Sequence, residues 1–277
     1  MVRQYANTVQ AQQVTDLMTE ALIFSLTVGI SVGVAAGYLG SLMVLEKMAL
    51  VGDALSHVAL PGIALGILYG FNPFIGAFAF LFTSAVMIWQ LGRITKLSFE
   101  TLVGAVFTLS LAIGILIIPE PELLEALFGD ITTVGLMDTI IAIAVSVVAI
   151  FLTRTIYKGI VLGMISEELA ISKGVKVARM NLLYLLLVSM VVAIGIKITG
   201  TLLVGFLVVT PAAAAKIVSS NLYRYSMLSS IFGGASAFSG VLLSSYLNLH
   251  PGPLVVLAGV TIFFASVLIK WTKPSAS

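Results

Sequence analysis

Two potential metal ligands, Asp53 and His57, lie four residues apart in a stretch that is otherwise almost wholly apolar. On an α-helix this spacing stacks both side chains on one face, with Ser56 beside them. A carboxylate oxygen and an imidazole nitrogen together suit zinc, manganese or ferrous iron. We therefore interpret Asp53 and His57 as ligands of a divalent metal ion. The alternative is a buried pair with a purely structural role.

The composition places this pair in a membrane protein. Of 277 residues, 60% are hydrophobic and 9% are charged, whereas soluble domains carry about 25% charged residues. An aspartate inside a membrane helix costs about 2.5–3.5 kcal/mol on insertion scales, so such a residue usually has a function. The chain has no cysteine, which excludes disulfides, thiolate metal sites and cysteine nucleophiles. A net charge of +2 gives no indication of nucleic-acid binding.

Nine apolar stretches approach the length of about 20 residues that a membrane-spanning helix requires. The sixth and seventh meet at residues 199–201, so one of them can be a broken or re-entrant element. The prediction is therefore an all-α polytopic bundle of eight or nine transmembrane helices. The stretches are 21–40, 50–69, 74–91, 101–118, 135–157, 180–198, 202–219, 227–247 and 254–270.

The whole chain, residues 1–277, is predicted to be one transmembrane domain of a cell membrane, with a polar segment at 1–20 and a loop at 158–179. Basic residues concentrate in cytoplasmic loops. Placing Arg93 on the cytoplasmic side brings every basic residue except Arg3 and Lys197 to that side. The loop 158–179 is then cytoplasmic, and the acidic stretch 119–138 faces outward.

The cytoplasmic loop carries the signals of a short helix over residues 167–173. Ser166 is a good N-cap, two glutamates follow it, and Gly174 suits the position after the last turn. A helix of two turns is marginal alone, so we interpret it as a docking element held by a partner. An ordinary connector is the alternative. The residues assigned to this element are Glu167, Glu168, Leu169, Ala170, Ile171, Lys173 and Gly174.

Other positions give weaker indications. His250 lies in a proline-rich turn, and Asp130 lies in the outer acidic stretch; both could meet an ion at the outer mouth, or both could be ordinary loop residues. Thr210 and Pro211 predict a kink, either at a gate or as a simple bend. Glycines recur every four residues over 29–37 and 62–70, a pattern typical of close helix packing in lipid.

The segment 40–66, above all 48–62 (MALVGDALSHVALPG), resembles the signature of permeases from the zinc/manganese/iron class of ABC importers. The stretches 127–131, 168–174 and 201–214 resemble the same family in the same order, so the resemblance runs nearly from end to end. The chain has no G-x-x-x-x-G-K-[ST] motif and cannot hydrolyse ATP itself.

The resemblance implies a permease like those of type II ABC importers, and not an enzyme. Such a permease is a homodimer that pairs with cytoplasmic ATPase subunits and receives its ion from an extracellular or periplasmic metal-binding protein. The resemblance also implies that the helix 167–173 couples to the ATPase, and that Asp53 and His57 help to form the ion path. Zinc, manganese or iron is the expected substrate, with no permanently bound cofactor. The family often has two basic residues where this chain has Glu46 and Lys47.

Two other functions stay open from the sequence. One is a proton-coupled secondary metal carrier, which would work without a separate ATPase. The other is a non-transporting membrane receptor subunit, which would move no metal. An intramembrane enzyme is disfavoured because the chain shows no second catalytic constellation.

Overall fold

The computed structural model describes residues 2–118, 126–128, 134–201 and 204–272. Over these residues the protein is a helical bundle without a β-strand, which confirms the predicted all-α class. The helices are α1 (Val2–Leu45), α2 (Ala49–Val58), α3 (Leu60–Tyr69), α4 (Pro73–Thr95), α5 (Phe99–Ile117), α7 (Leu136–Ile165), α8 (Glu167–Ser172), α9 (Val177–Thr199), α10 (Val204–Val218), α11 (Leu222–Leu247) and α12 (Pro251–Thr272).

The described part of the chain contains eight helical segments that are long and apolar enough to cross a membrane. The seventh apolar stretch forms α10, which has 15 residues. At 1.5 Å per residue this helix is about 22 Å long, shorter than a hydrocarbon core of about 30 Å. The predicted break is present, because α9 ends at Thr199 and Gly200 takes a positive φ of 73°. Within the described ranges, the candidate spans therefore number eight, the lower of the two counts that the sequence allowed.

The second span is built from two helices, α2 and α3, that meet at Ala59. Pro61 explains the break, because it has no amide hydrogen to donate to the carbonyl of His57. The helix α2 lies in the middle of the bundle, in contact with α1, α4, α5, α9 and α10. Its residues Val51, Leu55 and Val58 are completely buried or nearly so. The helix that carries Asp53 and His57 is thus enclosed on most of its surface.

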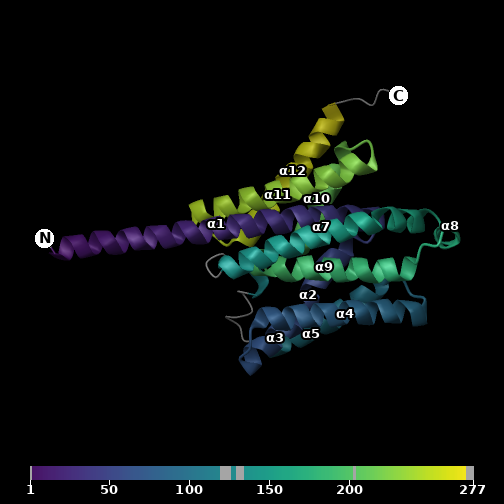
Figure 1. Cartoon of the computed structure of the whole chain (residues 1–277), viewed down its shortest axis with the longest axis horizontal. Helices are drawn as coiled ribbons and strands as arrows, with labels where there is room; N and C mark the ends of the chain where they lie inside the picture. The colour runs from purple at the N-terminus through teal and green to yellow at the C-terminus, as the bar shows by residue number, and fades with distance from the viewer. Residues whose placement is uncertain (1, 119–125, 129–133, 202–203, 273–277) are drawn as a thin grey trace.

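The remaining helices lie on two sides of this centre. In Figure 1, α10, α11 and α12 lie on one side of α1, and α3, α4 and α5 lie on the other side of α9. The short helix α8 lies at the end of the bundle opposite the N-terminus. At the other end of α7, Lys197 forms a 2.6 Å salt bridge with Asp138. Lys197 and Asp138, which were both predicted to lie at the outer face, are therefore in contact.

Two boundaries differ from the sequence prediction. The helix α7 continues to Ile165, so the first part of the predicted loop 158–179 is helical. The polar segment 1–20 does not stand apart, because α1 runs without interruption from Val2 to Leu45. In both cases a polar stretch continues the helix of the adjoining span beyond the apolar residues.

The glycine repeats pack helices of the same chain together. A Cβ atom on Gly33 would lie 2.9 Å from the carbonyl carbon of Gly233, so α1 and α11 meet backbone to backbone. Gly62 and Gly76 bring α3 and α4 equally close. The predicted packing role is confirmed at these positions, whereas Gly70 ends α3 with a φ of 69° and has no neighbour within 4 Å. These faces are already covered, so they give no support to a contact with a second copy of the chain.

Candidate metal path

The cavity that contains Asp53 lies between α2 and α5. Asp53 is an exposed residue in an otherwise buried part of α2, and it lines a cavity of about 230 Å³. The remaining lining residues are Val51, Ala54, Glu100, Val103, Gly104 and Phe107. Most of this wall is apolar, so the two carboxylates are the principal sites for a cation.

Glu100 is a functional candidate that sequence reasoning missed. It lies in the first turn of α5, where the hydroxyl of Ser98 accepts a hydrogen bond of 3.3 Å from the amide of Thr101. An acidic residue in the first turn of a helix is ordinarily explained by the helix dipole. The only signal in the sequence was a carboxylate next to an apolar run. The packing of α2 on α5 brings Glu100 to the same cavity as Asp53.

His57 is not among the residues that line this cavity, but it contacts one of them. Its ring stacks at a tilt against Phe107, with 5.4 Å between the ring centroids. Its Nδ1 atom is buried and has no hydrogen-bond partner among the described residues. Buried polar atoms without a partner are rare in native proteins, so this nitrogen is a candidate ligand. Phe107 lines the cavity of Asp53, and His57 contacts it from outside the set of lining residues.

Ser56 does not reach this cavity. It is fully buried, and its hydroxyl donates a hydrogen bond of 2.6 Å to the backbone carbonyl of Asp53. A serine in a helix often turns its hydroxyl back to a carbonyl of the preceding turn in this way. Ser56 therefore does not line the cavity of Asp53, and its part in an ion path stays a prediction.

The backbone of Asp53 rests directly on α10. The contact is made at Gly205, where a Cβ atom would lie 2.7 Å from the amide nitrogen of Asp53 and 2.9 Å from the carbonyl carbon of Gly52. Only glycine allows the two helices to approach this closely. The position of the carboxylate is thus fixed from one side by α10, whereas α5 forms the cavity on the other.

The kink residues Thr210 and Pro211 are buried inside α10. Pro211 lies within the helix, where it removes the hydrogen bond to the carbonyl of Leu207. The helix continues beyond it to Val218. The sequence correctly predicted a proline inside a membrane helix. The role of this proline as a gate stays a prediction.

The outer candidates are not brought to Asp53 by any described contact. The ring of His250 stacks on Phe128, with the centroids 5.9 Å apart. Asp130 lies outside the described residues. Over the ranges that the structure describes, no three histidine, cysteine, aspartate or glutamate residues cluster so that they could hold a metal ion. Within those ranges, one copy of the chain therefore brings at most two such residues together at any one place.

The predicted short cytoplasmic helix is present as α8. The hydroxyl of Ser166 accepts a hydrogen bond of 3.2 Å from the amide of Leu169, and Gly174 has a φ of 78°. Leu169 and Ile171 are 44% and 59% exposed, whereas Ala170 is fully buried. A partner could therefore contact the first two side chains but not the third.

Comparison with known proteins gives the family. The model of the ABC 3 transport family matches residues 15–270. The manganese transport system membrane protein MntC of Listeria innocua is 33% identical over 255 residues, which cover 91% of this chain and 90% of MntC. The high-affinity zinc uptake system membrane protein ZnuB of Haemophilus influenzae is 29% identical, over 90% of this chain and 98% of ZnuB.

A solved structure agrees with these relatives. A chain of PsaBC from Streptococcus pneumoniae, determined in complex with Fab, matches with a TM-score of 0.77 and 29% sequence identity, over 95% of each chain. Neither the proton-coupled carrier nor the non-transporting receptor receives support from these matches. The chain belongs to the ABC 3 transport family and is a multi-pass membrane permease of an ABC transporter, with no enzyme activity of its own.

Proposed function

We propose that this permease carries manganese or zinc across the membrane, along a path that includes the cavity of Asp53 and Glu100. The observation that carries the proposal is the presence of two carboxylates in one small and otherwise apolar cavity. The names of MntC and ZnuB support these two metals. Iron is not part of the proposal, because neither relative is named for it.

The chemistry of such a path follows from the cost of a bare ion in hydrocarbon. Unpaired charge in an apolar medium is prohibitively unfavourable, so ligands must replace the water that a metal ion loses. Asp53 and Glu100 supply oxygen atoms, and His57 supplies a nitrogen. Oxygen ligands suit manganese, whereas zinc accepts both oxygen and nitrogen. A small number of ligands also binds the ion weakly enough to release it.

We further propose that two copies of the chain act together with two cytoplasmic ATPase subunits and an external metal-binding protein. Support for a second copy comes from the incomplete ligand set of one protomer, since structural zinc sites have four ligands. Two copies would double the ligands available to the ion. The exposed side chains of Leu169 and Ile171 on α8 are the proposed contact with the ATPase.

Metal uptake into proteoliposomes tests the path directly. The permease is reconstituted with its ATPase, and uptake of radioactive manganese and zinc is measured for Asp53→Asn, Glu100→Gln and His57→Ala. Loss of one ligand of a charged ion costs about 1.5–3 kcal/mol, so we expect uptake to fall about tenfold or more. Asp53→Asn and Glu100→Gln remove a charge but keep the size of the side chain, which favours normal folding.

Glu20→Gln is the matched control, because Glu20 is an exposed carboxylate on α1 that does not line the cavity. We expect this variant to transport normally. Assembly with the ATPase is measured for each variant by co-purification. Normal uptake by both Asp53→Asn and Glu100→Gln would show that the ion takes another path.

A further inference from the structure

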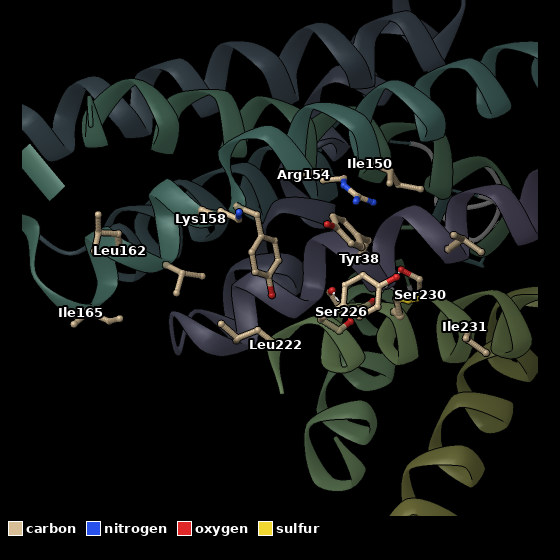
Figure 2. A pocket seen from close by; sticks show the side chains of 15 residues that line it. Tyr38, Ile150, Arg154, Lys158, Leu162, Ile165, Leu222, Ser226, Ser230 and Ile231 are labelled. Carbon is tan, nitrogen blue, oxygen red and sulfur yellow. Dashed lines mark hydrogen bonds between the residues drawn. The ribbon is translucent and has the colours of Figure 1, made fainter. Parts of the chain in front are cut away.

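A second cavity, of about 650 Å³, lies between α7 and α11 with α1 as its floor. It shares no residue with the cavity of Asp53. Most of its wall is apolar, but Arg154 and Lys158 from α7 lie along one edge and Tyr38 from α1 lies next to Arg154 (Figure 2). The proposed metal path uses none of these residues.

The charges of this cavity are all of one sign. Arg154 and Lys158 are four residues apart, so both lie on the same face of α7. No acidic residue lines the cavity, and within the described part of the chain neither cation forms a salt bridge. Ser226 and Ser230 also line it, but their hydroxyls donate to backbone carbonyls of α11. The cavity therefore presents two cations without a counter-charge.

The depth of the two cations can be worked out along α7. Asp138, in the salt bridge to Lys197, marks the outer end of this helix. Arg154 and Lys158 follow it by about 24 and 30 Å at 1.5 Å per residue. The hydrocarbon core is about 30 Å thick, so both cations lie near its inner boundary. Ile150 and Ile231 line the part of the cavity that lies deeper in the membrane.

We propose that this cavity binds an anionic phospholipid of the inner leaflet. The phosphate contacts Arg154 and Lys158 and accepts a hydrogen bond from the hydroxyl of Tyr38. One acyl chain follows the deeper part of the wall, past Ile150 and Ile231, toward the centre of the membrane. Basic pockets between helices on the cytoplasmic side are the typical sites of anionic lipids, because they combine charge with apolar surface at the right depth.

Other occupants fit the observations less well. A free phosphate ion would leave the apolar lining on the membrane side of the cations, which includes Ile150 and Ile231, uncovered. A second copy of the chain that packed symmetrically through this face would bring the same two cations together without an acid to pair them, and like charges at short range repel. The level of the cations, at the membrane boundary, favours a lipid.

Lipid binding to the purified complex of permease and ATPase tests the proposal. The complex is delipidated, and binding of phosphatidylglycerol and of phosphatidylcholine with the same acyl chains is measured by native mass spectrometry. The test variant is Arg154→Gln combined with Lys158→Gln. The matched control is Arg93→Gln combined with Lys96→Gln, which removes the same charge from another cytoplasmic turn that does not line the cavity.

We expect phosphatidylglycerol to bind more tightly than phosphatidylcholine, and the test variant to lose about 30-fold in affinity, since each cation contributes about fivefold. The control should bind as the natural chain does. Equal binding of the two lipids, or unchanged binding by the test variant, would overturn the proposal. Displacement of the lipid by inorganic phosphate alone would also overturn it, because the acyl chain would then contribute nothing.

A cysteine at the aliphatic wall distinguishes a lipid from a second protomer. The chain has no cysteine of its own, so Ile231→Cys introduces the only thiol. If a lipid fills the cavity, an oxidant should produce no disulfide between two copies, and phosphatidylglycerol should slow the reaction of the thiol with a maleimide. A disulfide-linked dimer in the assembled complex would show that a protomer covers this surface and would refute the lipid site.

Discussion

Replacing Gly205 with alanine tests whether α10 sets the position of Asp53. The added Cβ atom would lie 2.7 Å from the amide nitrogen of Asp53, whereas ordinary van der Waals contact begins at 3.4 Å. The neighbour is backbone, so no side-chain rotation can relieve the overlap. The Cα atom of Asp53 would be nearer still, so the helices α2 and α10 must separate by more than the 0.7 Å between these two distances, and Asp53 moves with α2.

The effects on stability and on transport should differ in size. Overpacking costs about 1–3 kcal/mol, and the gain in helix propensity from glycine to alanine returns about 0.5–1 kcal/mol. We therefore expect a loss of about 1–2 kcal/mol in the free energy of unfolding. A displacement of about 1 Å in a functional site can cost about 100-fold in rate, so metal uptake should fall far more than stability.

Uptake into proteoliposomes and thermal unfolding in detergent measure the two effects side by side. Gly92→Ala is the control, because a Cβ atom on Gly92 would meet only side-chain atoms, the nearest at 3.5 Å. We expect this variant to unfold and transport as the natural chain does. Normal uptake by Gly205→Ala would refute the idea that α10 positions the carboxylate. An equal loss in both variants would show only that α-helical glycines are needed in general.

Two further predictions concern the cytoplasmic side. Leu169→Asp should abolish co-purification of the ATPase while the permease still inserts, because a charge replaces an exposed apolar contact of α8; retention of the ATPase would remove α8 from the interface. Burial raises the pKa of Glu46, just after α1, from 4.5 to about 7. The contribution of Glu46 to the free energy of unfolding is therefore fully present below pH 4.5, and it is lost as the pH rises to about 7. Glu46→Gln should therefore raise the unfolding temperature at pH 8, by the equivalent of about 3 kcal/mol or less. At pH 4 the same substitution should change the unfolding temperature little. Equal shifts at both pH values would contradict a raised pKa of Glu46.

The helices could be predicted from the sequence because lipid imposes length and composition on each of them. A run of about 20 apolar residues has few other structures available in a membrane. The short helix α8 was predictable for a local reason as well, since Ser166 and Gly174 are capping residues whose effect depends on their immediate neighbours. The break at Ala59 had a local signal in Pro61, but the long apolar run concealed it.

The candidate site was predictable only in part, because its second carboxylate comes from another helix. Asp53 stood out as a charge within an apolar run, whereas Glu100 lies at a helix start, where acids are common. Their common cavity depends on the packing of α2 against α5. The burial of Ala170 depends likewise on tertiary contacts of α8, which a helix of six residues cannot reveal through its periodicity.

The two groups of charges in this bundle have different physical tasks, and their surroundings show it. The carboxylates Asp53 and Glu100 lie together in a cavity of about 230 Å³, and α10 fixes one of them through its backbone. The cations Arg154 and Lys158 border a cavity almost three times as large, at the level of the lipid headgroups. Because α7 leads directly into α8, an anionic lipid at this cavity would hold the cytoplasmic end of α7 next to the element that we assign to the ATPase.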